Sequence, residues 1–290
     1  MNNRLVLGTV QFGLKYGIAN QAGRVDPDEV EKILFEAASH GINMLDTAIA
    51  YGDSEKTLGA IGVAGWGIVS KLPALPDGCL DVAGWVETQI ENSLARLGVD
   101  CLYGVMLHCP EQLVTVSGGQ LLKALDSLKT QGFAKKIGVS VYSPEEIERL
   151  FSTMHFDLVQ APLNILDRRL VESGWAQRLN AQGVELHVRS AFLQGLLLMP
   201  AGKRPEKFRR WQWMWAEWDH WLCETGLTPL QACLRYALSV DGVDRVIVGV
   251  DSAAQLSEIL DAASGSLNSP PSWSRNIDVD LINPSRWNLL

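Results

Sequence analysis

The chain has 290 residues, of which 47% are hydrophobic and 20% are charged. This composition is sufficient for a packed core and excludes a wholly disordered chain. The 25 Lys and Arg residues are outnumbered by 33 Asp and Glu residues, which gives a formal net charge of −8. Because nucleic-acid binding depends on clustered cations, we expect no nucleic-acid partner.

Membrane and secretion signals are absent from the sequence pattern. No apolar run reaches the roughly 18 residues that a membrane-spanning helix needs, so no membrane partner is expected. The first residues enter a strand-like segment at once, without the long apolar stretch of a cleavable signal. The five cysteines show no C-x-x-C spacing, which is typical of reduced thiols. These features favour a soluble, cytoplasmic protein.

Short apolar runs alternate with amphipathic segments along the chain. The predicted strands are Leu5–Gly8, Asn43–Leu45, Gly67–Ser70, Leu102–Leu107, Lys136–Val139, Phe156–Val159, Val184–Val188 and Arg245–Val248. The first predicted helix has Asp26 as its N-cap, a proline in its first turn and a glycine at its end. Similar helical segments begin at Val82, Gly118, Ser143, Asp167, Thr228 and Ser252.

The alternation of strands and helices predicts the fold class. It indicates parallel strands joined by right-handed crossovers. Eight such strands in a chain of this length predict an α/β protein with a (β/α)₈ TIM barrel, formed as a single domain over residues 1–290. An open doubly wound sheet is the alternative, but no G-x-G-x-x-G follows the first strand.

Two segments lie outside the alternation. Residues 200–226, between the seventh strand and its helix, carry five tryptophans, of which Trp211, Trp215 and Trp218 share a helical face. We expect this insert to form an extra helix packed on the barrel rim, with a lid or a dimer contact as the alternative. The tail, residues 265–290, is rich in Ser, Pro and Asn, and we expect it to run as ordered coil.

Ionisable residues stand at the ends of three successive predicted strands. These are Asp46, Lys71 and His108, and Tyr51 follows Asp46 by five residues in the next loop. The carboxyl ends of barrel strands converge on one mouth, where enzymes of this fold have their active sites. A capping Asp or a structural His would explain any one of these residues alone, but four at the same end indicate a catalytic site.

The residue types suit proton delivery to a carbonyl oxygen. A tyrosine hydroxyl ordinarily has a pKa of about 10, and a neighbouring ammonium favours its phenolate. A carboxylate would keep that ammonium charged, and an imidazole could orient the carbonyl. No hydride source is present among these side chains, so a nicotinamide cofactor is expected to supply it. The five histidines show no metal-ligand spacing, and no metal is predicted.

Over nearly its whole length the sequence resembles the aldo-keto reductase superfamily. The matching stretches are LGTVQFG, GINMLDTAIAYGDSEKTLG, IVSKL, SLARLGVDCLYGVMLHCP, KIGVSVYSPEEIERL, FDLVQAPLNILDR and FLQGLLL. The D-T-A-x-x-Y-G-x-S-E string, followed in order by a strand-end Lys and His, is the most specific of these features.

The resemblance implies a role for each matching position. Tyr51 would be the general acid, Asp46 and Lys71 would tune it, and His108 would orient the carbonyl. The residues implied to bind the cofactor are Gly8, Thr9, Asp46, Ser140, Gln160, Arg189, Ser190, Phe192, Gln194, Gly249, Asp251 and Gln255. Among these, Ser140 and Gln160 would hold the nicotinamide carboxamide. Phe12 and Cys109 would contact the substrate.

Several positions depart from the superfamily pattern. Val141 stands where an Asn is common, and Arg189 stands where an aromatic residue usually stacks on the nicotinamide. A guanidinium could stack on a ring or reach an anionic substrate, and it should disfavour the cationic oxidised cofactor. Gly249 and Gln255 replace the basic residues that usually hold a 2′-phosphate, so both NADPH and NADH remain possible cofactors.

These observations together predict an NAD(P)H-dependent oxidoreductase that reduces an aldehyde or ketone. The alternative is a cofactor-binding regulatory or subunit-type member of the same fold with little turnover. An unrelated barrel hydrolase or isomerase would need a metal or phosphate constellation that the sequence lacks. The expected partner is a small carbonyl substrate, while its identity and the oligomeric state are not predicted.

Overall fold

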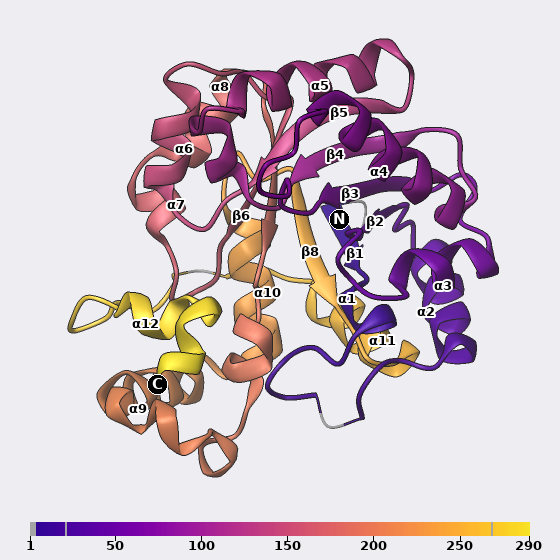
Figure 1. Cartoon of the computed structure of the whole chain (residues 1–290). Helices are drawn as coiled ribbons and strands as arrows, with labels where there is room; N and C mark the ends of the chain where they lie inside the picture. Colours follow the sequence, from indigo (N-terminus) through magenta and orange to yellow (C-terminus); the bar gives the residue numbers. More distant parts are fainter. Residues whose placement is uncertain (1–3, 21, 268) are drawn as a thin grey trace.

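Eight parallel strands form the centre of the molecule in a computed structural model that describes residues 4–20, 22–267 and 269–290. They close into a barrel in sequence order (Figure 1). The strands are β1 (Leu5–Gly8), β2 (Met44–Asp46), β3 (Gly67–Leu72), β4 (Leu102–Leu107), β5 (Ala134–Ser140), β6 (Leu158–Pro162), β7 (Glu185–Arg189) and β8 (Arg245–Gly249). Pairing of β1 with β8, with Val6 opposite Ile247, completes the barrel and excludes the open sheet. The predicted (β/α)₈ TIM barrel is therefore confirmed.

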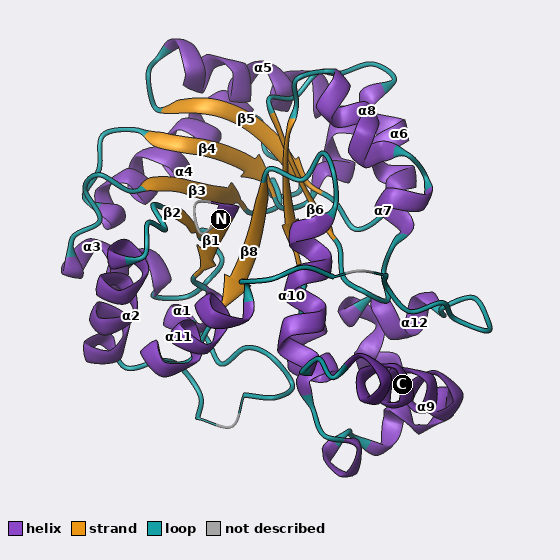
Figure 2. Ribbon diagram, turned by 180° about the vertical axis from the view of Figure 1, so that it is seen from behind, coloured by secondary structure: helices purple, strands orange, loops and turns teal. Residues whose placement is uncertain are grey.

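Helices surround the barrel (Figure 2). The α-helices are α1 (Val10–Gly13), α2 (Pro27–Ser39), α3 (Ser54–Ile61), α4 (Val82–Leu97), α5 (Gly118–Thr130), α6 (Pro144–Phe151), α7 (Arg169–Glu172), α8 (Trp175–Ala181), α9 (Gln212–Thr225), α10 (Pro229–Ser239), α11 (Ala253–Ala262) and α12 (Val279–Ile282). Short 3₁₀ helices are η2 (Pro110–Val114), η3 (Leu193–Leu198), η4 (Ala201–Lys203), η5 (Glu206–Trp211) and η6 (Pro284–Leu289). No helix in the described part of the chain is long and apolar enough to cross a membrane.

Side-chain capping determines where several of these helices begin. The Asp26 carboxylate accepts a hydrogen bond from the Asp28 backbone N–H at 3.0 Å. Thr228 and Gln231 form a reciprocal capping box at the start of α10. Ser252 caps α11 by accepting from the Gln255 N–H at 3.2 Å. These caps satisfy backbone donors that have no partner in the first helical turn.

The barrel interior is filled by a small apolar layer. It consists of inward-facing residues from six strands, namely Val6, Met44, Val69, Met106, Leu158 and Ile247. A larger apolar core lies between the strands and the surrounding helices. Because the inner layer fills the middle of the barrel, the ionisable residues above it face the mouth, at the carboxyl ends of the strands.

A polar network closes the barrel at the end opposite the mouth. Glu185, the first residue of β7, accepts hydrogen bonds from the Tyr103 hydroxyl at 2.6 Å and from the Lys136 ammonium. Its other carboxylate oxygen lies 2.7 Å from Nε2 of the fully buried His187. Burial alone would raise the pKa of Glu185, but the hydrogen bonds from His187, Lys136 and Tyr103 hold it at about 2.

The predicted helix that begins at Asp167 is divided in the structure. Gly174 has φ +76°, in the left-handed region, and separates α7 from α8. The apolar periodicity continues across this break, which is why the sequence pattern indicates a continuous helix. A left-handed residue interrupts helical geometry, and glycine adopts it without steric cost.

The insert and the tail pack against each other. Figure 1 shows α9, α12 and the C-terminus side by side, and Figure 2 agrees from behind. Trp287 of the tail meets Phe208 of the insert at a ring-centroid distance of 4.9 Å, and the Trp211 indole N–H donates to Asp278 at 3.2 Å. The expectation of a coil tail is wrong, because α12 and η6 form where residues of the tail contact the insert.

Candidate functional site

Polar side chains from consecutive strands meet at the mouth of the barrel. Asp46 ends β2, Lys71 stands next to last in β3, and His108 directly follows β4. Ser140 at the end of β5 is paired in register with Gln160 of β6. The parallel register thus brings the three predicted strand-end residues together, along with two of the predicted cofactor residues.

Asp46 and Lys71 form a buried ion pair. The Lys71 ammonium donates to the Asp46 carboxylate at 2.6 Å and to the Thr47 carbonyl oxygen at 3.0 Å. Asp46 is 4% exposed and Lys71 is 1% exposed. Burial alone would lower the pKa of Lys71, but the negative charge of Asp46, helped by Tyr51, raises it above its ordinary value. Lys71 therefore remains an ammonium at neutral pH.

A hydrogen-bond relay holds the second oxygen of Asp46. The Gln160 amide donates to that oxygen at 2.7 Å, and the Gln160 carbonyl oxygen accepts from the Ser140 hydroxyl at 3.3 Å. All three side chains are buried. The relay gives hydrogen-bond partners to buried polar groups, which would cost free energy if they were left without partners. It also holds in place the Asp46 carboxylate that keeps Lys71 protonated.

Tyr51 and His108 lie over this ion pair. The Lys71 Nζ is 5.1 Å from the centre of the Tyr51 ring, and the two aromatic rings meet edge to face at 5.9 Å. Burial lowers the pKa of His108 to about 4, and the cationic Lys71 and Arg189 contribute to this shift. The imidazole is therefore neutral at pH 7 and has one N–H donor and one acceptor.

A close backbone contact positions the loop that carries Tyr51. The Ile49 N–H donates to the Lys71 carbonyl oxygen at 3.2 Å, so the loop starts on the edge of β3. Gly13, the last residue of α1, packs directly against this loop. A Cβ on Gly13 would lie 1.7 Å from the Tyr51 carbonyl oxygen, so a larger residue at Gly13 would displace the loop.

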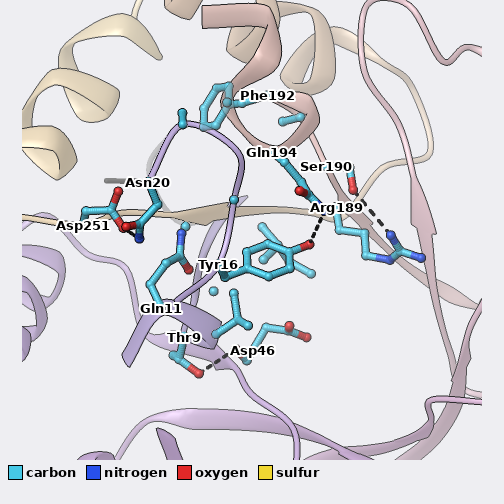
Figure 3. Close-up of a pocket in the computed structure, with 18 of the residues that line it drawn as sticks. Thr9, Gln11, Tyr16, Asn20, Asp46, Arg189, Ser190, Phe192, Gln194 and Asp251 are labelled. Carbon is cyan, nitrogen blue, oxygen red and sulfur yellow. Dashed lines mark hydrogen bonds between the residues drawn. The ribbon is translucent and has the colours of Figure 1, made fainter. Parts of the chain in front are cut away.

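An elongated pocket of about 550 Å³ opens above these side chains. Figure 3 shows Asp251 and Asn20 on one side of it and Arg189 on the other. The predicted residues that line it are Gly8, Thr9, Asp46, Tyr51, His108, Ser140, Gln160, Arg189, Ser190, Phe192, Gln194, Gly249, Asp251 and Gln255. A pocket of this size with converging polar groups is typical of a small-molecule or cofactor site.

Three predicted site residues lie outside the pocket wall. Lys71 lies behind Asp46, so it acts on the pocket through its neighbours. Phe12 is fully buried in the core between strands and helices and does not line the pocket. Cys109 is half-buried as the residue before η2, and it does not line the pocket. The short helix α1, which the sequence pattern did not indicate, turns Phe12 inward.

Residues 14–20, which follow α1, cross the pocket and add side chains that the sequence analysis did not single out. The Asn20 side-chain amide donates to the Asp251 carboxylate at 3.1 Å. The Tyr16 hydroxyl accepts from the Gln194 amide at 3.3 Å. These contacts join loops about 180 to 230 residues apart in the chain, which no local sequence pattern predicts. The Trp-rich insert, by contrast, contributes no described residue to the pocket wall.

The turn after β7 has an unusual backbone. Ser190, Leu193 and Gln194 have φ values of 63°, 49° and 53°, in the left-handed region. The Asn164 side chain holds the turn by donating to the Ser190 carbonyl oxygen at 3.1 Å. Such backbone costs free energy and is concentrated at ligand sites, where the surrounding structure maintains it.

The far end of the pocket is acidic and can accommodate a ligand with hydrogen-bond donors. Asp251, Gln255 and Glu258 line it, and Arg189 is the only Lys or Arg among the described lining residues. Burial raises the pKa of Asp251, and its hydrogen bond with Asn20 opposes this shift. The Gln11 side-chain oxygen is buried and has no partner among the described residues, which fits a donor group of a bound molecule.

No group of His, Cys, Asp and Glu able to hold a metal occurs among the described residues. The cofactor residues expected from the resemblance, in contrast, surround a continuous pocket. The Ser140 hydroxyl and the Gln160 amide form a hydrogen-bonded pair in the pocket wall. The Gln11 side chain, whose oxygen has no partner among the described residues, lies next to Gly249 in the same wall. A Cβ on Gly249 would lie 2.5 Å from the Gln11 amide nitrogen, so a larger residue there would displace the Gln11 side chain. These residues fit a dinucleotide.

Comparison with known proteins identifies the family. The sequence profile of the Aldo/keto reductase family matches residues 4–270. The chain belongs to the aldo/keto reductase family. It is 27% identical over 217 residues to an aldo-keto reductase of Gibberella moniliformis, covering 69% of this chain and 64% of that protein. It is 26% identical over 186 residues to one of Bacillus subtilis, covering 59% and 53%. The matched segments thus span less than two thirds of either relative.

Solved structures of aldo-keto reductases share the fold. The holo form of an aldo-keto reductase from Bacillus halodurans superimposes with a TM-score of 0.71 at 22% identity. The match covers 92% of this chain and 88% of that one. At this identity the likeness establishes a common barrel for the two aldo/keto reductases.

Proposed function

We propose that this aldo/keto reductase reduces an aldehyde or ketone to an alcohol with NAD(P)H. The observation that carries the proposal is the buried Asp46–Lys71 ion pair directly below Tyr51, in a pocket that fits a dinucleotide. When bound, the reduced nicotinamide supplies a hydride to the carbonyl carbon. The protein then has to deliver one proton to the carbonyl oxygen.

Tyr51 is the proposed proton donor. Its O–H bond breaks as the carbonyl oxygen takes the proton, which leaves negative charge on the phenolate. The Lys71 ammonium, 5.1 Å from the ring centre, stabilises that charge in a site where Asp46 keeps Lys71 protonated. His108 is neutral and therefore orients the carbonyl by hydrogen bonding, without competing as an acid.

The cofactor is proposed to lie along the pocket. Ser140 and Gln160 would hold the nicotinamide carboxamide, and Gly8, Thr9 and Asp46 would also contact the cofactor. Ser190, Phe192 and Gln194 would line the path of the diphosphate, and Arg189 would stand beside the nicotinamide. Gly249, Asp251 and Gln255 would contact the adenosine. Support for this arrangement comes from the pocket, which these residues line and in which Asp251 and Asn20 lie on one side and Arg189 on the other (Figure 3).

Replacement of Tyr51 tests the proton donor. Tyr51→Phe keeps the ring and removes the hydroxyl, so carbonyl reduction should fall by at least about a hundredfold. The Kd for NADH, measured by fluorescence titration, should be retained. Lys71→Met should be similarly damaging because it removes the cation that stabilises the phenolate. Wild-type and variant proteins with equal, negligible turnover would instead indicate a regulatory, cofactor-binding role.

We further propose that the enzyme discriminates weakly between NADH and NADPH. A 2′-phosphate is normally held by Arg or Lys, whereas the carboxylates Asp251 and Glu258 line the end of the pocket proposed for the adenosine. A carboxylate can accept hydrogen bonds from free ribose hydroxyls. The two dissociation constants should differ by less than about tenfold, or about 1.4 kcal/mol. A hundredfold preference for NADPH would contradict this assignment.

A further inference from the structure

Arg189 is the last residue of β7 and carries a positive charge into the pocket. Its neighbours on the chain place it at the mouth, level with Pro162 of β6 in the strand register. The positive charge of the guanidinium contributes to the lowered pKa of His108. It also opposes the rise that burial causes in the pKa of Tyr16. It is therefore near the proposed position of the substrate carbonyl.

The structure holds the guanidinium in a fixed orientation. Its Cζ lies 4.4 Å from the centre of the Tyr142 ring, so the planar group stacks on an aromatic face. One Nη donates to the Val141 carbonyl oxygen at 3.0 Å, and the other is 3.4 Å from the Ser190 hydroxyl oxygen. A guanidinium has five N–H donors, so these contacts leave about three for a ligand.

Among the residues that the structure describes, the charge of Arg189 has no counter-ion. Within the described part of the chain, its polar contacts are to neutral groups and no carboxylate pairs with it. The other buried cation of the mouth, Lys71, is paired with Asp46. A half-buried, unpaired guanidinium is unfavourable unless a ligand supplies the anion, and Arg is well suited to bind planar carboxylates and phosphates in a bidentate manner.

We propose that Arg189 binds an anionic group, a carboxylate or phosphate, on the carbonyl substrate itself. This inference rests on the proposed reductase function and names its substrate class. Arg189 points to the opposite side of the pocket from Asp251 and Asn20, where the adenosine is proposed to lie (Figure 3). Its charge is therefore directed at the Tyr51 and His108 end, where the substrate would bind.

The test compares matched anionic and neutral substrates within each enzyme. The pairs are succinic semialdehyde with its methyl ester, and glycolaldehyde phosphate with glycolaldehyde. In the wild type, the kcat/KM ratio of anionic to neutral compound should be about thirtyfold or more for at least one pair. The pair with the larger ratio identifies carboxylate or phosphate. In Arg189→Gln that ratio should approach unity, chiefly through KM of the anionic compound.

A charge-matched control separates local from general electrostatics. Arg178→Gln removes one cation from an exposed pair with Glu148 on the outside of the barrel, and it should leave the ratio unchanged. An equal ratio in the wild type and Arg189→Gln would overturn the proposal. If the Kd of Arg189→Gln for NADH were also tenfold or more above that of the wild type, Arg189 would hold the cofactor phosphates instead.

A binding measurement keeps this inference distinct from the reductase function. Succinate should bind the NADH-saturated wild type, as measured by calorimetry, while the neutral succinamide should not. Arg189→Gln should weaken succinate binding by at least about tenfold. If no carbonyl is reduced but succinate binding depends on Arg189, the proposed reaction fails and the anion site stands. If succinate binds both proteins equally, the anion site fails whatever the reaction.

Discussion

At the scale of single residues, the mouth of the barrel brings together side chains that lie far apart in the chain. Asp46, Lys71 and His108 could be predicted because strand ends of a barrel meet at one mouth. The support of Asp46 by Gln160, from 114 positions away, could not, because it depends on the strand register. The burial of Phe12 was not predicted, because it depends on the short helix α1.

The neutrality of His108 is testable by NMR titration of the histidine ring. We expect a pKa of about 4, against an ordinary 6.5, because burial and two nearby cations disfavour the imidazolium. The unfolded chain takes up this proton first, so the contribution of His108 to the free energy of unfolding falls as the pH drops from about 6.5 to about 4. Arg189→Gln should raise the measured pKa. A wild-type value of 6 or above would contradict the site electrostatics described here.

At the scale of elements, periodicity located every strand to within a few residues, since buried parallel strands are short apolar runs bounded by turns. Helix starts at Asp26, Thr228 and Ser252 were equally readable, because capping is a local interaction. The break within a helical segment and the loop contacts over the pocket could not be predicted in this way. The break at Gly174 follows from its left-handed backbone, and residues 14–20 cross the pocket through contacts with residues far along the chain.

The polar network at the closed end of the barrel predicts a pH-dependent stability. Glu185→Gln should lower the free energy of unfolding by roughly 2–3 kcal/mol at pH 7, because Lys136 loses its counter-ion and the buried His187 loses a charged hydrogen-bond partner. The folded pKa of Glu185 is about 2 against an ordinary 4.5, so this stabilisation is present above about pH 4.5 and is lost as the pH falls toward 2. Urea unfolding of both proteins at several pH values measures the difference, which would stay constant with pH if the network contributed nothing.

At the scale of the whole molecule, the tail closes against the insert through aromatic contacts. Composition alone suggested coil for this segment, because Ser, Pro and Asn dominate its first part. The residues that order it, Trp287 and Asp278, meet partners in the insert that lie about 70 to 80 positions earlier. We propose that insert, tail and barrel unfold as a single domain.

Substitution of Trp287 tests this cooperativity. Trp287 is 3% exposed and packs edge to face on Phe208, so Trp287→Ala should lower the free energy of unfolding by about 3–5 kcal/mol. Leu289→Ala, at a site that is 85% exposed in the same segment, should change it by less than about 0.5 kcal/mol. Urea transitions followed by tryptophan fluorescence and by circular dichroism should coincide in all three proteins. Separate transitions would mean that the tail and insert unfold independently of the barrel.

The two ends of strand β7 have different roles, one in stability and one in ligand binding. They are about 13 Å apart, the length of four residue steps. Glu185 at its first position anchors the closed end of the barrel, and Arg189 at its last position faces the ligand pocket. A directed-evolution library randomised at Arg189 would therefore explore new substrates with little loss of folded protein. The same library placed at Glu185 would be depleted of soluble clones before any selectivity could be scored.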